Sequence, residues 1–325
     1  MPANKTIILV TGGAGFIGSH LCERLINDGH AVRCIDDLSY GSYKNLAPVI
    51  NNPDFEFVET DVCDLDAVKD AVKDVSTVYH LAARKIPRYG DALSTLVVNN
   101  EGAKNVLGAC MDDKIKVVLA STSDVYGKGE PPFKETDNLV IGPSQSRRWS
   151  YAVSKIFDEH MALACYGEGQ LPVVILRFFG SYGPRHHRSW WGGPQSVFID
   201  QVLSDSELTI HGDGKQTRSF TYIDDLINGI VTAGENPKAV GEIFNLGSDD
   251  ECTILRLAET INEIIRGDKK ANIKFIPYES FGGNYEDVRR RIPDLAKAKE
   301  LLGFEWKTSL KDGLTKTVEW HKSNQ

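Results

Sequence analysis

The sequence predicts an α/β fold, with a doubly wound parallel sheet of the Rossmann type and a smaller α/β lobe. Three observations lead to this expectation. Short apolar runs rich in β-branched residues alternate with stretches of helical apolar spacing. A glycine-rich turn stands between the first apolar run and the first helical stretch. From about Arg185 onward the alternation loosens, which indicates a second, differently organised part of the chain.

The strands are predicted from runs that are too apolar to face water, as in sheets covered on both faces. These runs are Thr6–Thr11, Ala31–Ile35, Phe55–Val58, Thr77–His80, Lys116–Ala120 and Pro172–Leu176. A helix is expected over Ser19–Asp28, and further helical stretches separate most of the later strands. Strands that alternate with helices pair in parallel through right-handed crossovers, which gives a doubly wound sheet.

The second part of the chain is expected to be interleaved with the first, because no repeat or flexible linker separates them. Residues 1–184 should form the Rossmann domain, to which residues 212–250 return, and residues 185–325 should form most of the smaller lobe. The segment Arg185–Gln195, rich in glycine, tryptophan and histidine, is predicted to be an ordered loop. Helices are expected around Ser196–Leu203, Ile254–Ile265 and Leu295–Leu302.

Composition excludes several classes of protein. Of the 325 residues, 41% are hydrophobic and 25% charged, and the net charge of -8 argues against a nucleic-acid surface. No run approaches the ~20 apolar residues that span a bilayer, and no secretory signal is recognisable. The six cysteines lack metal-binding spacing, and the His186-His187 pair has no carboxylate at ligand spacing, so no metal is predicted. We expect a cytoplasmic protein with reduced thiols.

The glycine-rich turn has the spacing of a dinucleotide fingerprint. Gly12 allows a tight turn, Gly15 lets the backbone approach a pyrophosphate, and Gly18 permits close packing of helix on sheet. Phe16 and Ile17 complete the turn at the start of the predicted helix, where backbone N–H groups favour an anion. The turn therefore predicts a dinucleotide cofactor.

An acidic residue at the end of the second strand identifies the cofactor. Asp36 is placed to accept hydrogen bonds from both adenosine ribose hydroxyls and to repel a 2′-phosphate, which favours NAD over NADP. The neighbouring Asp37 is a second candidate for this role. Asp61 and Val62, after the third strand, either face the adenine or form an ordinary loop pair.

A candidate catalytic group follows from a tyrosine and a lysine four residues apart. Tyr151 and Lys155 share one helical face, and the hydroxyl cluster Ser121–Ser123 follows a predicted strand. A tyrosine that accepts a proton must first lose its own, and a nearby ammonium lowers the pKa of the phenol from about 10. Thr122 is placed to hydrogen-bond the same substrate hydroxyl. Together with the glycine turn, these residues predict proton and hydride transfer.

The motifs, in order, resemble the extended short-chain dehydrogenases/reductases, and within them the NAD-dependent sugar-nucleotide epimerase/dehydratase family. The resemblance covers nearly the whole chain. It is carried by the glycine turn, His80–Ala83, Asn99 with Gly102, Ser121–Gly127, Tyr151–Lys155, Tyr182–Pro184, Gly212–Asp225 and Arg291–Asp294.

The resemblance implies an NAD that oxidises a hexose hydroxyl, usually at C4, to a transient ketone and later returns the hydride. It implies a homodimer built from the helix with Tyr151 and the helix near Glu101–Cys110. It makes Tyr151 the general base, Lys155 the ribose ligand, and Thr122 and Ser123 partners in catalysis. Further cofactor contacts fall on Leu81, Ala82, Ala83, Lys85 and Asn99, and substrate contacts on Ser123, Asp124, Arg148, Arg185, Arg218 and Arg291.

The segment Ser123–Tyr126 bears on the reaction. Dehydratases of the family carry Asp-Glu where this chain has Ser123-Asp124, and serine is a poor acid for a leaving hydroxyl. Decarboxylases of UDP-glucuronate carry STSEVYG, one methylene longer than STSDVYG, and an Arg-Trp-x-Tyr segment similar to the one that begins at Arg148. Arg148 either meets a substrate carboxylate or is a solvated loop residue.

We predict a nucleotide-sugar epimerase, because the shorter Asp124 should sit farther from the substrate and push less strongly toward CO₂ loss. The alternative is a UDP-glucuronate decarboxylase. A second alternative is a regulatory protein that binds NAD without chemistry, against which Thr122, Tyr151 and Lys155 argue. The loop Arg185–Gln195 resembles that of GDP-mannose 3,5-epimerase, whose cysteine is absent here. Gly180 stands where the family usually has a phosphate-contacting asparagine.

Overall fold

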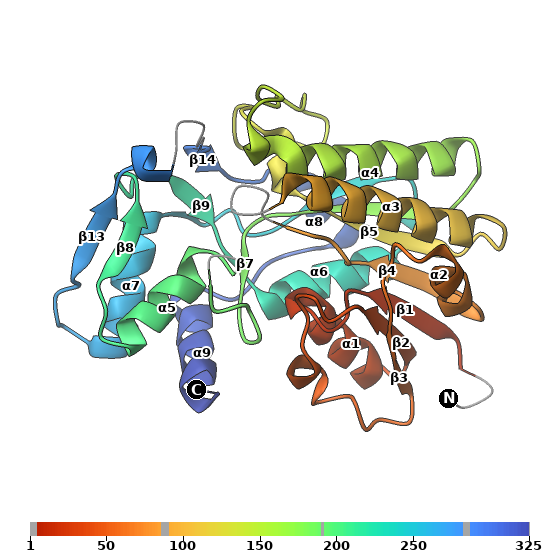
Figure 1. The fold of residues 1–325 in the computed structure, drawn as a ribbon, viewed down its shortest axis with the longest axis horizontal. Coiled ribbons are helices and arrows are strands. Elements are labelled where there is room, and N and C mark those ends of the chain that lie inside the picture. The colour runs from red at the N-terminus through yellow and green to blue at the C-terminus, as the bar shows by residue number, and fades with distance from the viewer. Residues whose placement is uncertain (1–4, 86–90, 190–191, 282–286, 325) are drawn as a thin grey trace.

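The computed structural model describes residues 5–85, 91–189, 192–281 and 287–324, and it confirms the predicted fold class (Figure 1). Within these residues a seven-stranded sheet has the order β11-β6-β5-β4-β1-β2-β3, and every pair in it is parallel. Its strands are β1 (Ile7–Thr11), β2 (Ala31–Asp36), β3 (Phe55–Glu59), β4 (Val75–His80), β5 (Lys116–Thr122), β6 (Val173–Phe178) and β11 (Ile243–Leu246).

The order of the strands creates a switch point in the middle of the sheet. The chain starts at β1, winds outward through β2 and β3, and then returns to place β4 on the other side of β1. In open parallel sheets a ligand binds beyond the carboxyl ends of the strands at such a point. Thr11 of β1 and His80 of β4 are register partners there.

Helices cover both faces of the sheet (Figure 1). One face carries α1 (Phe16–Asn27) and α6 (Ile223–Glu235), and the other carries α2 (Leu65–Ala71), α3 (Ala92–Met111) and α4 (Ser150–Gly167). Consecutive strand residues divide between the two cores, as strand geometry requires. Val118 packs with the α1 and α6 side, whereas Val117 and Leu119 pack with the α2, α3 and α4 side.

The remaining part of the described chain forms three small sheets and additional helices. The sheets pair β7 (Ser181–Tyr182) with β10 (Thr221–Tyr222), β8 (Leu208–His211) with β13 (Ile273–Ile276), and β9 (Thr217–Ser219) with both β12 (Glu251–Thr253) and β14 (Arg290–Arg291). The helices are α5 (Pro194–Leu203), α7 (Ile254–Arg266), α8 (Ala296–Leu302) and α9 (Leu310–Ser323). Short 3₁₀ turns are η1 (Tyr43–Leu46), η2 (Ser123–Tyr126), η3 (Arg147–Trp149), η4 (Pro237–Ala239) and η5 (Tyr278–Phe281).

Several element boundaries differ from the predictions, two of them next to the ends of the central strands. The first helix begins at Phe16 rather than Ser19, because Gly15 caps it and the turn runs directly into it. The loop after Arg185 ends at Gly193, since Pro194 occupies the first turn of α5, where its missing N–H costs nothing. The strand β11 and the helix α6 return to the first sheet, while the division of the chain at residue 184 stays a prediction.

Within the described ranges, no helix is both long enough and apolar enough to cross a bilayer. The same ranges hold no cluster of three or more histidine, cysteine or acidic residues arranged to bind a metal.

The predicted dimer can be tested on α3 and α4, which lie side by side (Figure 1). Leu93 and Val97 on α3 and Val153 and Phe157 on α4 are between 44% and 69% exposed, so these helices present apolar side chains to solvent. Phe157→Glu is expected to weaken dimerisation at least about tenfold, because it puts a charge into an apolar contact. Sedimentation velocity measures the change. Phe275→Glu, at an exposed site on β13, is the control, and a wild-type monomer at micromolar concentration would contradict the prediction.

Candidate active site

Two adjoining cavities lie beyond the carboxyl ends of the central strands. The larger, of about 680 Å³, contains the glycine turn and the ends of β2 and β4. The smaller, of about 310 Å³, lies between the end of β5 and the loop that precedes α5. Both volumes are in the range of small-molecule sites. The walls shared by the two cavities are Ile17, Lys85, Ser121, Tyr151, Phe178 and Ser181.

The glycine turn has a backbone that only glycine can provide at two positions. Gly12 adopts a φ of +69°, and a Cβ on Gly18 would lie 2.2 Å from the carbonyl oxygen of Gly12. Gly15 caps α1, and no side chain satisfies the N–H groups of the first helical turn there. The turn and helix start, with Gly12, Gly15, Phe16, Ile17 and Gly18, line the larger cavity, so these N–H groups suit a phosphate.

Asp36 is held firmly at the end of β2. Its carboxylate accepts hydrogen bonds from the backbone N–H groups of Ala14 (3.0 Å) and Leu38 (2.9 Å). Burial raises the pKa of Asp36, and these two hydrogen bonds oppose the rise. Asp37 lies beside it but is exposed and bonds to Ser39. Both aspartates line the larger cavity, as do Asp61 and Val62.

The other predicted cofactor residues divide into two groups. Leu81, Ala82, Ala83 and Lys85 line the larger cavity. Asn99 belongs to neither cavity wall: its side chain bonds to the backbone of Arg84 (2.7 and 3.2 Å) and to Ser154 Oγ (2.9 Å), and so ties the loop after β4 to α4.

Tyr151 and Lys155 occupy successive turns of α4 and face the cavities. Tyr151, 9% exposed, lies where the two cavities join. Burial raises its pKa, the carboxylates of Asp124 and Asp158 raise it further, and a hydrogen bond with Thr122 lowers it. Lys155 Nζ donates a hydrogen bond to Asp158 Oδ2 at 3.0 Å, and both side chains are buried. Thr122 ends β5, so the switch from strand to the η2 turn brings its hydroxyl to α4.

Arginines and carboxylates alternate in the wall of the smaller cavity. Arg148 Nη2 (2.8 Å) and Arg291 Nη1 (2.6 Å) both contact Asp124 Oδ1, and Arg218 Nη2 donates to Asp287 Oδ1 at 2.8 Å. Burial lowers the pKa of Arg291 to about 10, against the opposing effect of Asp124. Ser123 lines the same wall.

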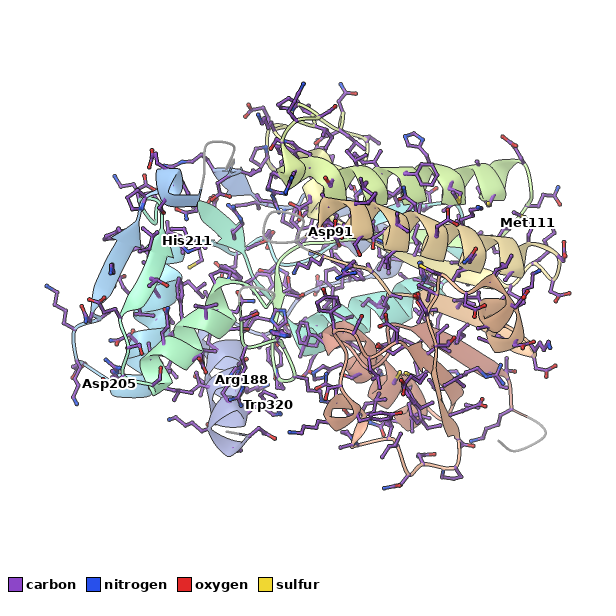
Figure 2. All side chains as sticks on the ribbon, viewed as in Figure 1. Asp91, Met111, Arg188, Asp205, His211 and Trp320 are labelled. Carbon is purple, nitrogen blue, oxygen red and sulfur yellow. The ribbon has the colours of Figure 1, made fainter. Side chains whose placement is uncertain are left out.

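Arg185 was predicted to contact substrate, but it lines the larger cavity and pairs with Glu23 of α1. The neighbouring His186 is buried and stacks on Phe16, with ring centroids 4.1 Å apart. Arg188 and Trp320, both labelled in Figure 2, also line this cavity. The predicted loop residues Trp190 and Trp191 fall outside the described residues.

Gly180 has a steric explanation in the fold. It lines the smaller cavity, and a Cβ at this position would lie 2.7 Å from the carbonyl oxygen of Ser219. An asparagine there would require the backbone to move, so the phosphate contact expected in the family is missing at this position. Gln195 and Asp287, which the sequence analysis missed, line the same cavity, and no local motif marks either of them.

Known proteins resemble this chain in sequence and in fold. Residues 8–247 match the model of the NAD dependent epimerase/dehydratase family. The chain is 37% identical to the UDP-N-acetyl-alpha-D-glucosaminuronate decarboxylase of Bacillus cytotoxicus over 98% of each chain. It is 39% identical to UDP-glucuronic acid decarboxylase 1 of Arabidopsis thaliana, over 96% of this chain and 68% of that protein. The structure of UDP-glucuronic acid 4-epimerase from Bacillus cereus, in complex with UDP-glucuronic acid and NAD, superposes with a TM-score of 0.89 at 33% identity, over 98% of this chain and 100% of that one.

Proposed function

Because the chain belongs to the NAD-dependent epimerase/dehydratase family, we propose that it decarboxylates a UDP-linked hexuronate through a 4-keto intermediate. UDP-glucuronate and its 2-acetamido analogue are the two candidate substrates, since both occur among the names of the similar decarboxylases. The observation that carries the proposal is the Asp124 carboxylate, which two arginines hold in the cavity wall beside Tyr151.

The cofactor is NAD, and the residues present fit it. The glycine cradle leaves no room for a Cβ at Gly18, and Asp36 stands at the ribose-recognition position with its carboxylate fixed. Lys85 and Lys155 would hold the end of the cofactor nearest Tyr151. When bound, NAD supplies the hydride acceptor and donor for C4 of the sugar.

Tyr151 is the proposed base in the first step. Its Oη takes the proton of the C4 hydroxyl, which Thr122, a hydrogen-bond partner of Tyr151, orients. Lys155 lies one helical turn away on α4, and a nearby positive charge favours the phenolate that must exist beforehand. The product of this step is a β-keto acid. Its C5–C6 bond breaks, CO₂ leaves, and the electron pair moves onto the C4 oxygen as an enolate. Tyr151, now protonated, donates a hydrogen bond to that oxygen as its charge grows, and C5 takes up a proton to give a 4-keto pentose. Return of the hydride that NAD would hold, with the proton of Tyr151 going to the C4 oxygen, would complete the UDP-pentose.

The contacts of Asp124 with two arginines in the smaller cavity favour loss of CO₂ over epimerisation. The sequence predicted epimerisation on the ground that Asp124 is short. In the structure Asp124 is nevertheless close enough to Tyr151 to raise its pKa, second only to burial. Asp124 also engages Arg148 and Arg291, so less positive charge remains to hold a substrate carboxylate in the ring plane. Asp124 thereby weakens the attraction between these arginines and a substrate carboxylate, which leaves that carboxylate freer to rotate out of the ring plane and depart as neutral CO₂.

Epimerisation at C4 is the second candidate. Similarity to the Bacillus cereus 4-epimerase supports it, since that enzyme's complex holds UDP-glucuronic acid in the same fold. With a uronate as substrate, it also requires a cation that holds the carboxylate, a role open to Arg148 if it exchanges Asp124 for the substrate. A regulatory role without chemistry fits less well, because binding alone needs no tyrosine between an ammonium and a hydroxyl partner.

A panel of nucleotide sugars tests the proposal. NAD-loaded protein is incubated with UDP-glucuronate, its 2-acetamido analogue and UDP-glucose, and the products are identified by proton NMR. We expect a UDP-pentose from at least one uronate and no reaction with UDP-glucose, which has no carboxylate to lose. Conversion of UDP-glucose to UDP-galactose, with the uronates unchanged, would contradict the proposal.

The position of Asp36 predicts the cofactor preference. A 2′-phosphate would approach a fixed carboxylate, so NADP should bind at least about tenfold more weakly than NAD. Calorimetry on protein stripped of cofactor measures both affinities, and Asp36→Ala should narrow the difference. Equal or tighter binding of NADP to the wild-type protein would refute the assignment.

A further inference from the structure

Two neighbouring carboxylates on α4 are buried, and each has a different cationic partner. Asp158 is 0% exposed and Glu159 is 3% exposed. Glu159 receives two hydrogen bonds from Arg177, at 2.9 and 2.7 Å, and a third from Ser121. Asp158 accepts from Lys155 Nζ at 3.0 Å. A buried carboxylate is costly without a cation, so each of the two holds its partner in place.

Lys155 is the sole hydrogen-bonding partner of the Asp158 side chain among the described residues. The second oxygen, Oδ1, is buried and has no hydrogen-bond partner within that part of the chain. Asp158 belongs to neither cavity wall, whereas Lys155 lines the larger cavity and Tyr151 lines both. Asp158 therefore influences the groups of the two cavities in two ways only: through its hydrogen bond to Lys155 and through the electrostatic effect of its charge on Tyr151.

We infer that Asp158 is a positioning residue: its carboxylate holds the Lys155 ammonium at the cofactor cavity and offsets its charge, so that Asp158 sets the pH at which Tyr151 loses its proton. The inference rests on the proposed function in taking Tyr151 as the base. It goes beyond that function, because it assigns a role to a residue that lines neither of the two cavities.

The charges around Tyr151 fix the sign of the effect. Asp124 faces it from η2 and Asp158 from α4, and both carboxylates disfavour the phenolate. Lys155 lies one helical turn from Tyr151 on α4, and a nearby positive charge favours the phenolate. His80, on β4, faces Lys155 but is neutral, since burial and the Lys155 charge lower its pKa to about 3. Removing the charge of Asp158 leaves the ammonium without its counter-charge, so the pKa of Tyr151 should fall.

The test is Asp158→Asn in NAD-loaded protein. Asparagine keeps the shape and an oxygen that accepts from Lys155, and it removes only the charge. Tyr151 ionisation is followed by the ultraviolet difference absorbance of tyrosinate, with the titration of Tyr151→Phe subtracted to remove the other tyrosines. We expect the midpoint to fall by about one pH unit or more. The acid limb of the kcat profile should move in the same direction.

Glu159→Gln is the matched control. It neutralises an equally buried carboxylate on the next residue, whose counter-charge is Arg177 rather than Lys155. It should lower thermal stability but leave the Tyr151 midpoint within about 0.3 pH unit. An unchanged or raised midpoint in Asp158→Asn, or an equal shift in Glu159→Gln, would overturn the inference.

A second variant and a measurement that needs no substrate allow the role of Asp158 to be tested in every case. Asp158→Ser carries the same test if Asp158→Asn does not fold, and failure of both to fold would assign Asp158 to stability and overturn the inference. The tyrosine titration needs no substrate. If no uronate is turned over, the proposed function fails, while the midpoint still decides the role of Asp158.

Discussion

Tyr151→Phe is expected to reduce turnover by about 10²- to 10⁴-fold, the usual effect of losing a general base. The substitution removes one oxygen from a side chain that is 9% exposed and lies at the junction of the two cavities. Without it, the C4 hydroxyl loses its proposed base and the later enolate oxygen loses its proposed hydrogen-bond donor. Steady-state rates on the substrate identified by NMR measure the loss.

NAD affinity should remain within a few-fold in this variant, because the glycine turn and Asp36 are untouched. Thr122→Val, which removes the hydroxyl that bonds Tyr151, should produce a smaller loss of kcat. A Tyr151→Phe protein that turns over within a few-fold of the wild type would remove Tyr151 from the mechanism.

Glu159→Ala is expected to lower the free energy of unfolding by about 3–5 kcal/mol, the usual cost of removing one partner of a buried pair. The Arg177 guanidinium, bound to Glu159 in a two-pronged contact, would be left buried without a counter-charge. Because Arg177 lies on β6 and Glu159 on α4, the pair joins a central strand to the helix that carries Tyr151. Guanidinium denaturation measures the change.

The matched control is the more exposed pair between Arg33 and Glu56. It has a similar contact distance of 2.8 Å, but the Glu56 side chain is 40% exposed. Glu56→Ala should change the free energy of unfolding by no more than about 1 kcal/mol, because water already solvates that carboxylate. Equal losses in the two variants would show that burial does not set the strength of these pairs.

Local patterns were enough to predict six of the seven strands of the central sheet and the cofactor turn, but not the strand β11. Neighbouring residues alone account for the apolar runs of β1 and β2 and for the glycines at positions 12, 15 and 18. The spacing of Tyr151 and Lys155 likewise placed both on one face of α4. Such features follow from side-chain periodicity and backbone sterics, which act over short range.

The ion pairs of the smaller cavity could not be predicted, because their members are distant in sequence and become neighbours only in the folded chain. Arg291 lies on β14 and Asp124 on η2, distant in sequence, and nothing in the sequence near either residue indicates their contact. Gly180 is explained by the carbonyl of Ser219, which belongs to another strand. The Lys155–Asp158 pair is the exception: its three-residue spacing on a helix was visible, but its burial was not.

The most direct test of the proposed decarboxylation is a single incubation of NAD-loaded protein with UDP-glucuronate, and in parallel its 2-acetamido analogue, labelled with ¹³C at the carboxyl carbon. The label is then counted in released CO₂ and in the nucleotide-sugar product. We expect one labelled CO₂ for each UDP-pentose formed, because Asp124 engages the arginines that would otherwise hold the substrate carboxylate in the ring plane. Label retained in a C4-epimerised uronate, with no CO₂ released, would contradict decarboxylation and assign the chain to the epimerases.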